Sequence, residues 1–271
     1  MPNTVPPEMW GDGPSELPQD ICISALLEAQ NLTPALQSVV ASCPGGWAIT
    51  SAAANFLGQL VGQLQPKSVL EFGAGSSSVV LATALSLGGG GRLTSLEQSP
   101  RWCVDQWALV QQQKTVDAAM IVTKPELGWG CLGLYFWYKS AVQALAARAP
   151  FDLVLIDAPQ FFFGRDGALP LIYPYLNLNA LIVLDDAGRA DEKAAVARWL
   201  TTYPGLTLVY NDPDFSGKGL AVLKYQTEAD PVLSYPSFFS GVKQTLYTLI
   251  SSQRRYLRAK QARDELSYTD S

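Results

Sequence analysis

The sequence contains no histidine. This absence excludes Ser-His-Asp and Cys-His catalysis, histidine-ligated zinc or haem, and any histidine general base. A catalytic site in this chain must therefore use carboxylates, tyrosine, lysine, cysteine or a bound cofactor.

Cationic residues are few and unevenly placed. The chain has 19 Lys and Arg against 24 Asp and Glu, a formal net charge of −5, and no Lys or Arg precedes Lys67. No basic face is rich enough to follow a phosphate backbone, so we expect no nucleic-acid partner. Cations do gather in residues 254–263. A solvated helix of mixed charge explains them, and so does docking on the acidic N-terminal region of the same chain or of a partner.

Paired cysteines and long apolar runs are also missing. The four cysteines are scattered without a CxxC pair, which argues against a disulfide framework or a zinc site and fits a reducing compartment. No apolar run reaches membrane-spanning length, and the first residues lack the pattern of a secretory signal. We therefore expect a cytoplasmic protein with no membrane partner.

Short apolar runs alternate with helical patterns from residue 66 to residue 225. The predicted strands cover residues 68–72, 92–97, 119–123, 151–157, 180–184, 206–210 and 219–224. The predicted helices between them cover residues 78–87, 100–113, 134–148, 168–176 and 191–201, the last with Asp191 as its cap. Such alternation predicts βαβ units and a parallel sheet, but the last two strands are too close for a crossover helix. We therefore predict an α/β three-layer sandwich whose seven-stranded, mostly parallel sheet is closed by an antiparallel hairpin.

Three further segments flank this predicted domain. Residues 1–20 form an irregular arm rich in proline and glycine, and residues 21–65 form a helical segment with helices near 21–30 and 50–64. Thr50 or Ser51 is placed to cap the second of these helices. The segment 226–271 holds one long C-terminal helix over residues 237–266, which is a candidate element for homodimer formation.

A glycine-rich turn follows the first predicted strand, in the order Glu71-Phe72-Gly73-Ala74-Gly75-Ser76. The first glycine permits a tight turn, the second lets a ligand approach the backbone, and the next helix presents free N–H groups. The turn alone is compatible with NAD, FAD or an adenosyl cofactor. Glu71 would repel a pyrophosphate and attract an α-ammonium group, and Glu97 suits hydrogen bonds to ribose hydroxyls. These two acids favour the adenosyl cofactor.

The segment from Val69 to Ser78 resembles motif I of class I S-adenosylmethionine-dependent methyltransferases, in a variant with a Gly-x-Gly-x-Ser turn. Residues 151–157 and 180–186 resemble the fourth-strand and fifth-strand motifs of that family, and the resemblance covers about residues 45–225. It implies S-adenosylmethionine as the cofactor, with adenine near Lys124 and Pro125. The cofactor contacts that it implies are Thr50, Ser51, Glu71, Gly73, Ala74, Gly75, Ser76, Glu97, Gln98 and Asp157.

Asp157, Asp185 and Asp186 end two neighbouring predicted strands, so their carboxylates converge at one crevice. Three hard oxygen ligands suit Mg²⁺ or Ca²⁺, and the arrangement is similar to that of cation-dependent O-methyltransferases. Those enzymes carry a lysine shortly after the first Asp, whereas this chain has Ala158 and Pro159. The alternatives are that Asp157 contacts cofactor or substrate directly and that Asp185 or Asp186 caps the next turn. Asp157 and Asp186 are the candidate catalytic residues, because either carboxylate could take a proton from a hydroxyl acceptor.

Two further features concern the methyl acceptor. Arg189 could bind a substrate carboxylate or neutralise Asp185 or Asp186. Aromatic residues gather at 129, 135–138 and 161–163, where they are either core or the wall of an apolar pocket. We therefore predict methyl transfer to a hydroxyl or amine of a small, partly apolar or aromatic molecule. The alternatives are another adenosyl-cofactor or nucleotide-binding enzyme, and a non-catalytic binding protein of the same fold.

Overall fold

A computed structural model describes residues 21–28, 33–42, 49–159 and 163–251. The predicted arm of residues 1–20 lies outside these ranges, as do residues 252–266 of the predicted C-terminal helix. No helix within the described ranges is both long and apolar enough to cross a membrane.

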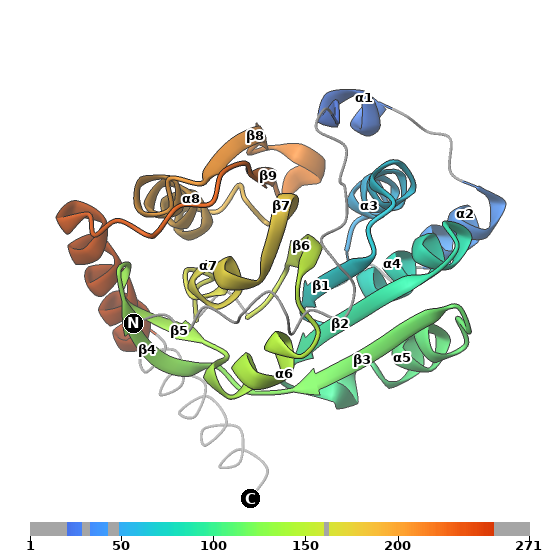
Figure 1. The fold of residues 1–271 in the computed structure, drawn as a ribbon, viewed down its shortest axis with the longest axis horizontal. Coiled ribbons are helices and arrows are strands. Elements are labelled where there is room, and N and C mark those ends of the chain that lie inside the picture. The colour runs from blue at the N-terminus through green and yellow to red at the C-terminus, as the bar shows by residue number, and fades with distance from the viewer. Residues whose placement is uncertain (1–20, 29–32, 43–48, 160–162, 252–271) are drawn as a thin grey trace, which may run out of the picture.

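Seven strands form one twisted sheet in the order β3-β2-β1-β6-β7-β9-β8 (Figure 1). They are β1 Ser68–Phe72, β2 Gly91–Glu97, β3 Val116–Val122, β6 Phe151–Ile156, β7 Leu176–Asp185, β8 Leu206–Asp212 and β9 Leu220–Tyr225. The first five are parallel, and β9 runs antiparallel to both β7 and β8. The predicted sheet, including its closing hairpin, is confirmed.

Helices cover both faces of the sheet, which explains why its central strands are continuously apolar. Val69, Leu153 and Val183 pack with α3 Ser51–Leu64, α4 Ser76–Leu87 and α5 Val104–Gln111. The alternate residues pack on the opposite face with α6 Val142–Ala146, α7 Ala168–Ile172 and α8 Ala190–Thr202. Two short helices, α1 Ile23–Glu28 and α2 Pro34–Ser42, contact α3.

The sequence predicted the first residues of α3 and α8 to within one residue, but it identified the capping residue only for α3. The hydroxyl of Thr50 accepts a hydrogen bond from the Ala53 N–H at 3.2 Å, so Thr50 caps α3 as predicted. The cap of α8 is Arg189, and the predicted cap Asp191 lies inside the first turn instead. There Asp191 accepts a hydrogen bond from the Gln244 side chain at 2.7 Å.

The predicted helix 134–148 is wrong in its first half. Residues 126–137 form a separate antiparallel hairpin, β4 Glu126–Gly130 and β5 Gly133–Trp137, and only α6 of the predicted helix is present. Glycine weakens a helix, and aromatic residues favour strands. Gly128 also allows the Trp137 ring to lie across the hairpin, because a Cβ there would be 2.4 Å from its Nε1.

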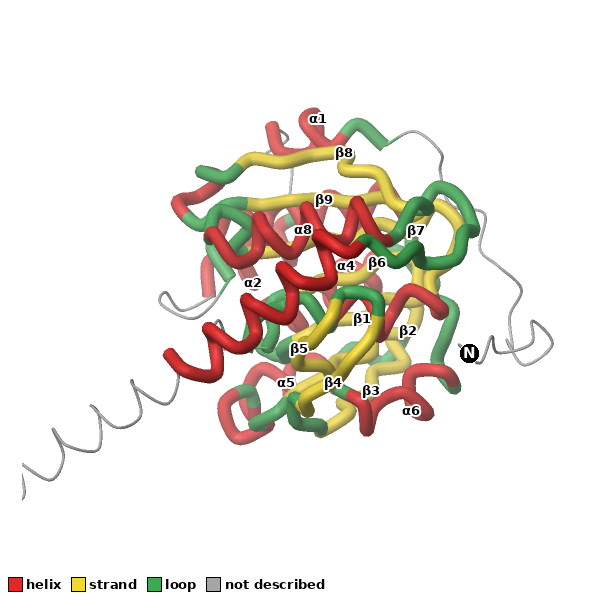
Figure 2. The backbone as a smooth tube through the Cα atoms, turned by 90° about the vertical axis from the view of Figure 1, so that its left-hand side faces the viewer, coloured by secondary structure: helices red, strands yellow, loops and turns green. Residues whose placement is uncertain are grey.

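Residues 235–251 are helical and pack against this hairpin (Figure 2). The Thr245 hydroxyl donates to the Leu134 carbonyl at 2.6 Å. A Cβ on Gly241 would lie 1.9 Å from the Leu132 carbonyl oxygen, so the helix approaches the hairpin closely at that point. The hairpin and this helix together form a layer outside the seven-stranded sheet.

Candidate functional site

A cavity of about 490 Å³ opens at the carboxyl ends of β1, β2 and β6. It lies where the strand order reverses between β1 and β6, which is where open α/β sheets bind their ligands. The residues that line it are Ile49, Gly73, Ala74, Gly75, Ser76, Ser77, Glu97, Gln98, Ser99, Trp102, Asp157 and Ala158.

The two glycines of the loop after β1 have different roles. Gly73 has a φ of +92°, and a Cβ there would lie 3.0 Å from the Cβ of Ala158, so the fold itself requires glycine. Gly75 has an extended φ of 177°, and a Cβ there would meet no atom of the described chain within 4 Å. A side chain at Gly75 would therefore lower the stability of the fold little, but it would narrow the cavity that Gly75 lines.

Glu71 lies behind the loop and does not line the cavity. Its carboxylate is fully buried and accepts hydrogen bonds from Ser77, from Ser78 at 2.6 Å and from Ser95 at 2.8 Å. Burial raises the pKa of Glu71 to about 7, and these hydroxyl groups oppose the rise. Since Ser78 also accepts the Gly75 N–H at 2.9 Å, Glu71 braces the loop from inside. Ser77, which sequence analysis missed, connects Glu71 to the cavity.

Glu97 ends β2 at the cavity wall, as predicted. One carboxylate oxygen accepts the Ala74 N–H at 2.9 Å, and the other accepts the Ser99 N–H at 2.6 Å. Each oxygen keeps a second lone pair for a ligand. Glu97 therefore joins the glycine-rich loop to the end of β2 and remains able to accept hydrogen bonds from hydroxyl groups.

Gln98 and Trp102 form the next part of the wall. The side-chain oxygen of Gln98 is buried and has no hydrogen-bond partner within the described chain, so a ligand donor could satisfy it. Trp102 is 75% exposed and lies in a 3₁₀ turn, Pro100–Trp102, with the Arg101 guanidinium 5.3 Å from its ring centroid. Sequence analysis missed Trp102 because it placed residues 100–113 in one helix.

The other predicted cofactor contacts divide into two groups. Ala74, Ser76 and Asp157 line the cavity. Thr50 and Ser51 do not, although their neighbour Ile49 does. The cavity lining also excludes Lys124 and Pro125, which connect β3 to the β4–β5 hairpin.

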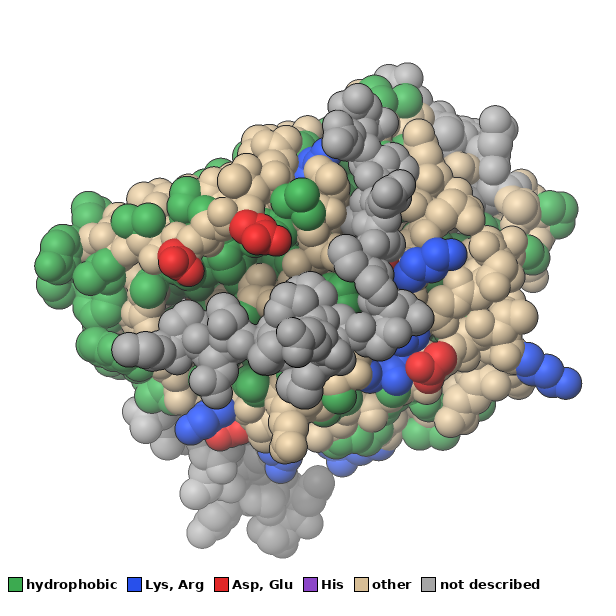
Figure 3. Space-filling model, in the orientation of Figure 1, with side chains coloured by type: hydrophobic (Ala, Val, Ile, Leu, Met, Phe, Trp, Pro, Cys, Tyr) green, Lys and Arg blue, Asp and Glu red, His purple; other side chains and the backbone are tan. Residues whose placement is uncertain are grey.

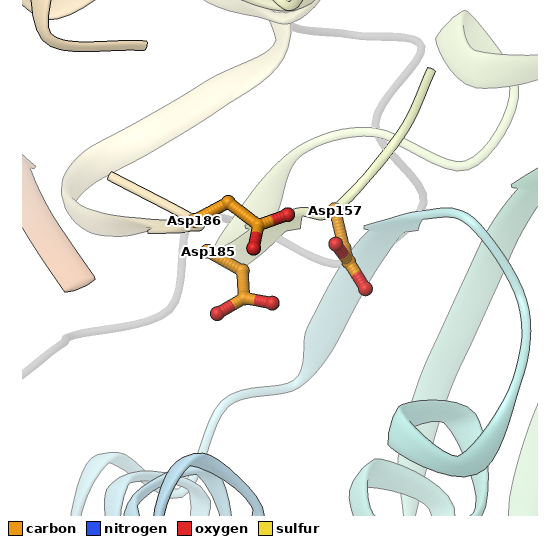
Figure 4. A group of neighbouring side chains, drawn as sticks. All are labelled: Asp157, Asp185 and Asp186. Atoms are coloured by element: carbon orange, nitrogen blue, oxygen red, sulfur yellow. The ribbon is translucent and has the colours of Figure 1, made fainter. Parts of the chain in front are cut away.

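Three carboxylates meet beside the cavity, as predicted (Figure 4). Asp157 follows β6, Asp185 ends β7 and Asp186 follows it, and one oxygen from each lies within 4.8 Å of the others. Burial raises the pKa of Asp157 to about 7. Asp185 and Asp186 add to this rise, whereas Arg165 opposes it.

Sequence analysis missed Arg165, which is the central cation of this cluster. Its side chain is 2% exposed, and its Nη2 atom lies 3.0 Å from Asp157 Oδ1 and 2.9 Å from Asp186 Oδ2. Its Nη1 atom donates to the Asp185 carbonyl oxygen. Arg189 also reaches Asp186 Oδ2, at 2.8 Å, which confirms the ion-pair interpretation of that residue.

The loop that carries Arg165 is held by later parts of the chain. Arg198 of α8 donates from Nε and from Nη2 to the two carboxylate oxygens of the neighbouring Asp166, each at 2.8 Å. The Trp199 indole donates to the Asp166 carbonyl at 3.0 Å. Phe163 packs against Phe136 of β5 with ring centroids 5.1 Å apart. The wall next to Asp157 is therefore anchored to both α8 and the β4–β5 hairpin.

The predicted aromatic clusters do not act as one group. Tyr135 and Tyr138 are buried in the core, and Trp129 is exposed. Phe136 of β5 and Phe163 of the loop that carries Arg165 pack against each other and are partly buried. Residues 161 and 162 lie outside the described residues.

No protein-family model and no curated protein matches the sequence. Similar solved structures do exist. A methyltransferase from Podospora anserina bound to S-adenosylhomocysteine has a TM-score of 0.54 and 15% identity, over 76% of this chain and 94% of that one. An O-methyltransferase from Bacillus cereus in complex with S-adenosylhomocysteine has a TM-score of 0.51 and 16% identity, over 76% and 100%. This chain has the class I methyltransferase fold.

Proposed function

We propose that this protein is an S-adenosylmethionine-dependent methyltransferase that acts on a hydroxyl group of a small molecule. The observation that carries the proposal is the cavity between β1 and β6, where the glycine-rich loop, Glu97 and Asp157 share one wall. The two structural neighbours bound to S-adenosylhomocysteine support the choice of cofactor.

The residues of the cavity fit this cofactor in chemical terms. The open backbone at Gly75 accommodates the amino-acid end, and Glu97 accepts hydrogen bonds from the ribose hydroxyls. The unpaired Gln98 oxygen can accept an adenine N–H, and the exposed Trp102 ring offers a face for stacking. When bound, the cofactor supplies a methyl group on a positively charged sulfur.

The chain contributes alignment and proton removal in this proposal. The loop between β1 and α4 and the end of β2 fix one reactant, and the anchored wall beside Asp157 fixes the other, which lowers the entropic part of the barrier. Asp157 accepts the proton of the hydroxyl acceptor, since its raised pKa brings it near neutral pH. The apolar side chains of Ile49, Trp102 and Ala158 in the cavity lining favour a partly apolar or aromatic acceptor.

Calorimetric titration with S-adenosylmethionine, with NAD titrated separately, tests the cofactor assignment. We expect binding of S-adenosylmethionine alone, weakened about tenfold or more by Gly75→Val because the new side chain enters the cavity. Gly62→Val is the matched control, since Gly62 is exposed on α3 with open space around it. Absence of binding, or a preference for NAD, would overturn the proposal.

Turnover is tested by measuring S-adenosylhomocysteine formed with panels of small phenols, alcohols and amines. Asp157→Asn should lower turnover of hydroxyl acceptors by about a hundredfold or more. Of the three clustered carboxylates Asp157 alone lines the cavity, and Asp186 is held by Arg165 and Arg189. If only amines are methylated, and Asp157→Asn does not change their turnover, then the acceptor is an amine and not a hydroxyl group.

A further inference from the structure

The cluster of Asp157, Asp185 and Asp186 has the donor chemistry of a magnesium site, because Mg²⁺ prefers carboxylate oxygen. Whether the cluster suits a metal depends on what else lies between these oxygens. In this structure a guanidinium group lies there.

Arg165 contacts one oxygen of each of two carboxylates in the cluster. Nη2 lies 3.0 Å from Asp157 Oδ1 and 2.9 Å from Asp186 Oδ2, so it bridges the two strand ends. A metal bound to both oxygens would have to lie about 2.1 Å from each, next to the same nitrogen. Two cations at that separation repel each other strongly, and the carboxylates cannot serve both.

The guanidinium is also fixed in place. It donates to two backbone carbonyls, that of Asp185 through Nη1 and that of Asp157 through Nη2 at 3.0 Å. Its Nε atom lies 3.8 Å from the carboxylate of Glu192, which is 1% exposed. The ion pair between Asp166 and Arg198 holds the adjacent residue of the loop. Arg165 is therefore held in the cluster by contacts with the ends of β6 and β7 and with α8.

We propose that the guanidinium of Arg165 takes the place of a divalent cation at this site, so that methyl transfer proceeds without a metal. This inference rests on the proposed function and deepens it. Arg165 is a positioning residue: it balances Asp157 and Asp186 and holds the Asp157 carboxylate at the cavity wall. Arginine suits this task because it stays protonated and its planar fork matches several oxygens at once.

Titration with Mn²⁺, followed by the loss of the free-ion signal in electron paramagnetic resonance, tests the proposal without cofactor or acceptor. We expect no bound Mn²⁺ in the wild-type protein. Arg165→Met removes the buried cation but keeps an apolar stem of similar length. Asp157 then has no ion-pair partner in the cluster and Asp186 keeps only the half-exposed Arg189, so we expect this variant to bind one Mn²⁺. The gain should disappear in the double variant that adds Asp186→Asn. Arg92→Met, outside the cluster, should bind no more than wild type.

Turnover gives a second readout that a merely structural role would not produce. Wild-type turnover should be unchanged by EDTA or by added Mg²⁺. Without metal, turnover by Arg165→Met should be about tenfold or more below that of wild type, and added Mn²⁺ should restore part of it. A wild-type protein that binds one Mn²⁺ through Asp157 and Asp186, or that needs Mg²⁺ for turnover, overturns the proposal.

The two proposals fail in different ways. If no acceptor is turned over, the proposed function is wrong, but the Mn²⁺ titration still shows whether Arg165 occupies the metal position. If Arg165→Met is folded by circular dichroism and still binds no Mn²⁺, the proposal that Arg165 takes the place of a metal is wrong. If that variant does not fold, the wild-type Mn²⁺ and EDTA measurements still decide the question.

Discussion

Glu71 shows at the scale of one residue how the cavity is supported from inside the fold. Its carboxyl group is fully buried and surrounded by the hydroxyl groups of Ser77, Ser78 and Ser95. Burial without a cation stabilises the protonated form, which is why its pKa rises to about 7. The stability of the loop is therefore linked to pH.

We expect Glu71 to make folding less favourable as the pH rises. The unfolded chain loses this proton near the ordinary value of 4.5, whereas the folded chain keeps it until about 7. Between these values the unfolded state binds fewer protons, so stability falls with rising pH and levels off above about 7. Relative to Glu71→Gln, the wild-type free energy of unfolding should drop by on the order of 3 kcal/mol across this window.

Urea denaturation at a series of pH values measures this difference. Glu126→Gln, at an exposed position of β4, is the control and should show no such trend against wild type. If the free energy of unfolding changes with pH in the same way in wild type and in Glu71→Gln, then burial does not hold the proton on Glu71.

The sequence was informative for residues whose position follows from a strand end. Glu97, Gln98, Asp157 and the three-carboxylate cluster lie where the strand pattern placed them. Arg165 could not be found in this way, because it lies in a loop and meets Asp186 only after β7 has paired with β6. The inward direction of Glu71 was missed for a related reason: three separate hydroxyl groups turn it away from the cavity.

The same distinction between local and distant causes holds for whole elements. The central strands were predictable since each is a short, continuous apolar run. The β4–β5 hairpin was not, because helix 235–251 supplies its packing from over a hundred residues away, as in the contact of Thr245 with Leu134. A pattern read along the chain does not contain that contact.

Gly241 is the point where this helix depends most on the hairpin. A Cβ there would lie 1.9 Å from the Leu132 carbonyl oxygen, so Gly241→Ala must move the helix away. We expect a loss of about 1–3 kcal/mol in the free energy of unfolding. Gly62→Ala makes the same change on an exposed helical position with open space and should be stabilising by up to about 1 kcal/mol.

Thermal and urea denaturation of the two variants measure the contrast. We expect the free energy of unfolding to fall in Gly241→Ala and to rise in Gly62→Ala. If Gly241→Ala were as stable as Gly62→Ala, the close approach of helix and hairpin would be wrong.

At the scale of the whole molecule, helix 235–251 presents an unusual distribution of side chains. Its buried residues include four small ones, Ser237, Gly241, Thr245 and Thr248. Its exposed residues include four large apolar ones, Tyr235, Phe239, Leu246 and Ile250. Figure 3 shows hydrophobic side chains gathered along the left edge, where Figure 1 places this helix. Contiguous apolar surface of this kind marks an interface.

A second copy of the chain is the partner that we expect on this face. Two such helices packed antiparallel would bury the same stripe from each copy, as a two-fold interface requires.

Light scattering after size-exclusion chromatography tests this expectation. The wild-type protein should elute as a dimer, and Leu246→Glu should elute as a monomer because a charge then lies in the interface. Leu87→Glu is the matched control, since Leu87 is exposed to a similar degree, 53% against 48%, at the end of α4. A monomeric wild-type protein, or a dimer that survives Leu246→Glu, would contradict the assignment.

The ion pair between Asp166 and Arg198 also sets an order of events during synthesis. The described residues that line the cavity all leave the ribosome by Ala158, and the strands behind them, β1, β2 and β6, are complete at the same stage. The wall beside Asp157 has to wait for Arg198, and the hairpin that supports Phe163 waits for the helix at 235–251. A growing chain thus completes the residues of the cavity first, and the wall beside Asp157 is anchored only after α8 and the helix at 235–251 have been made.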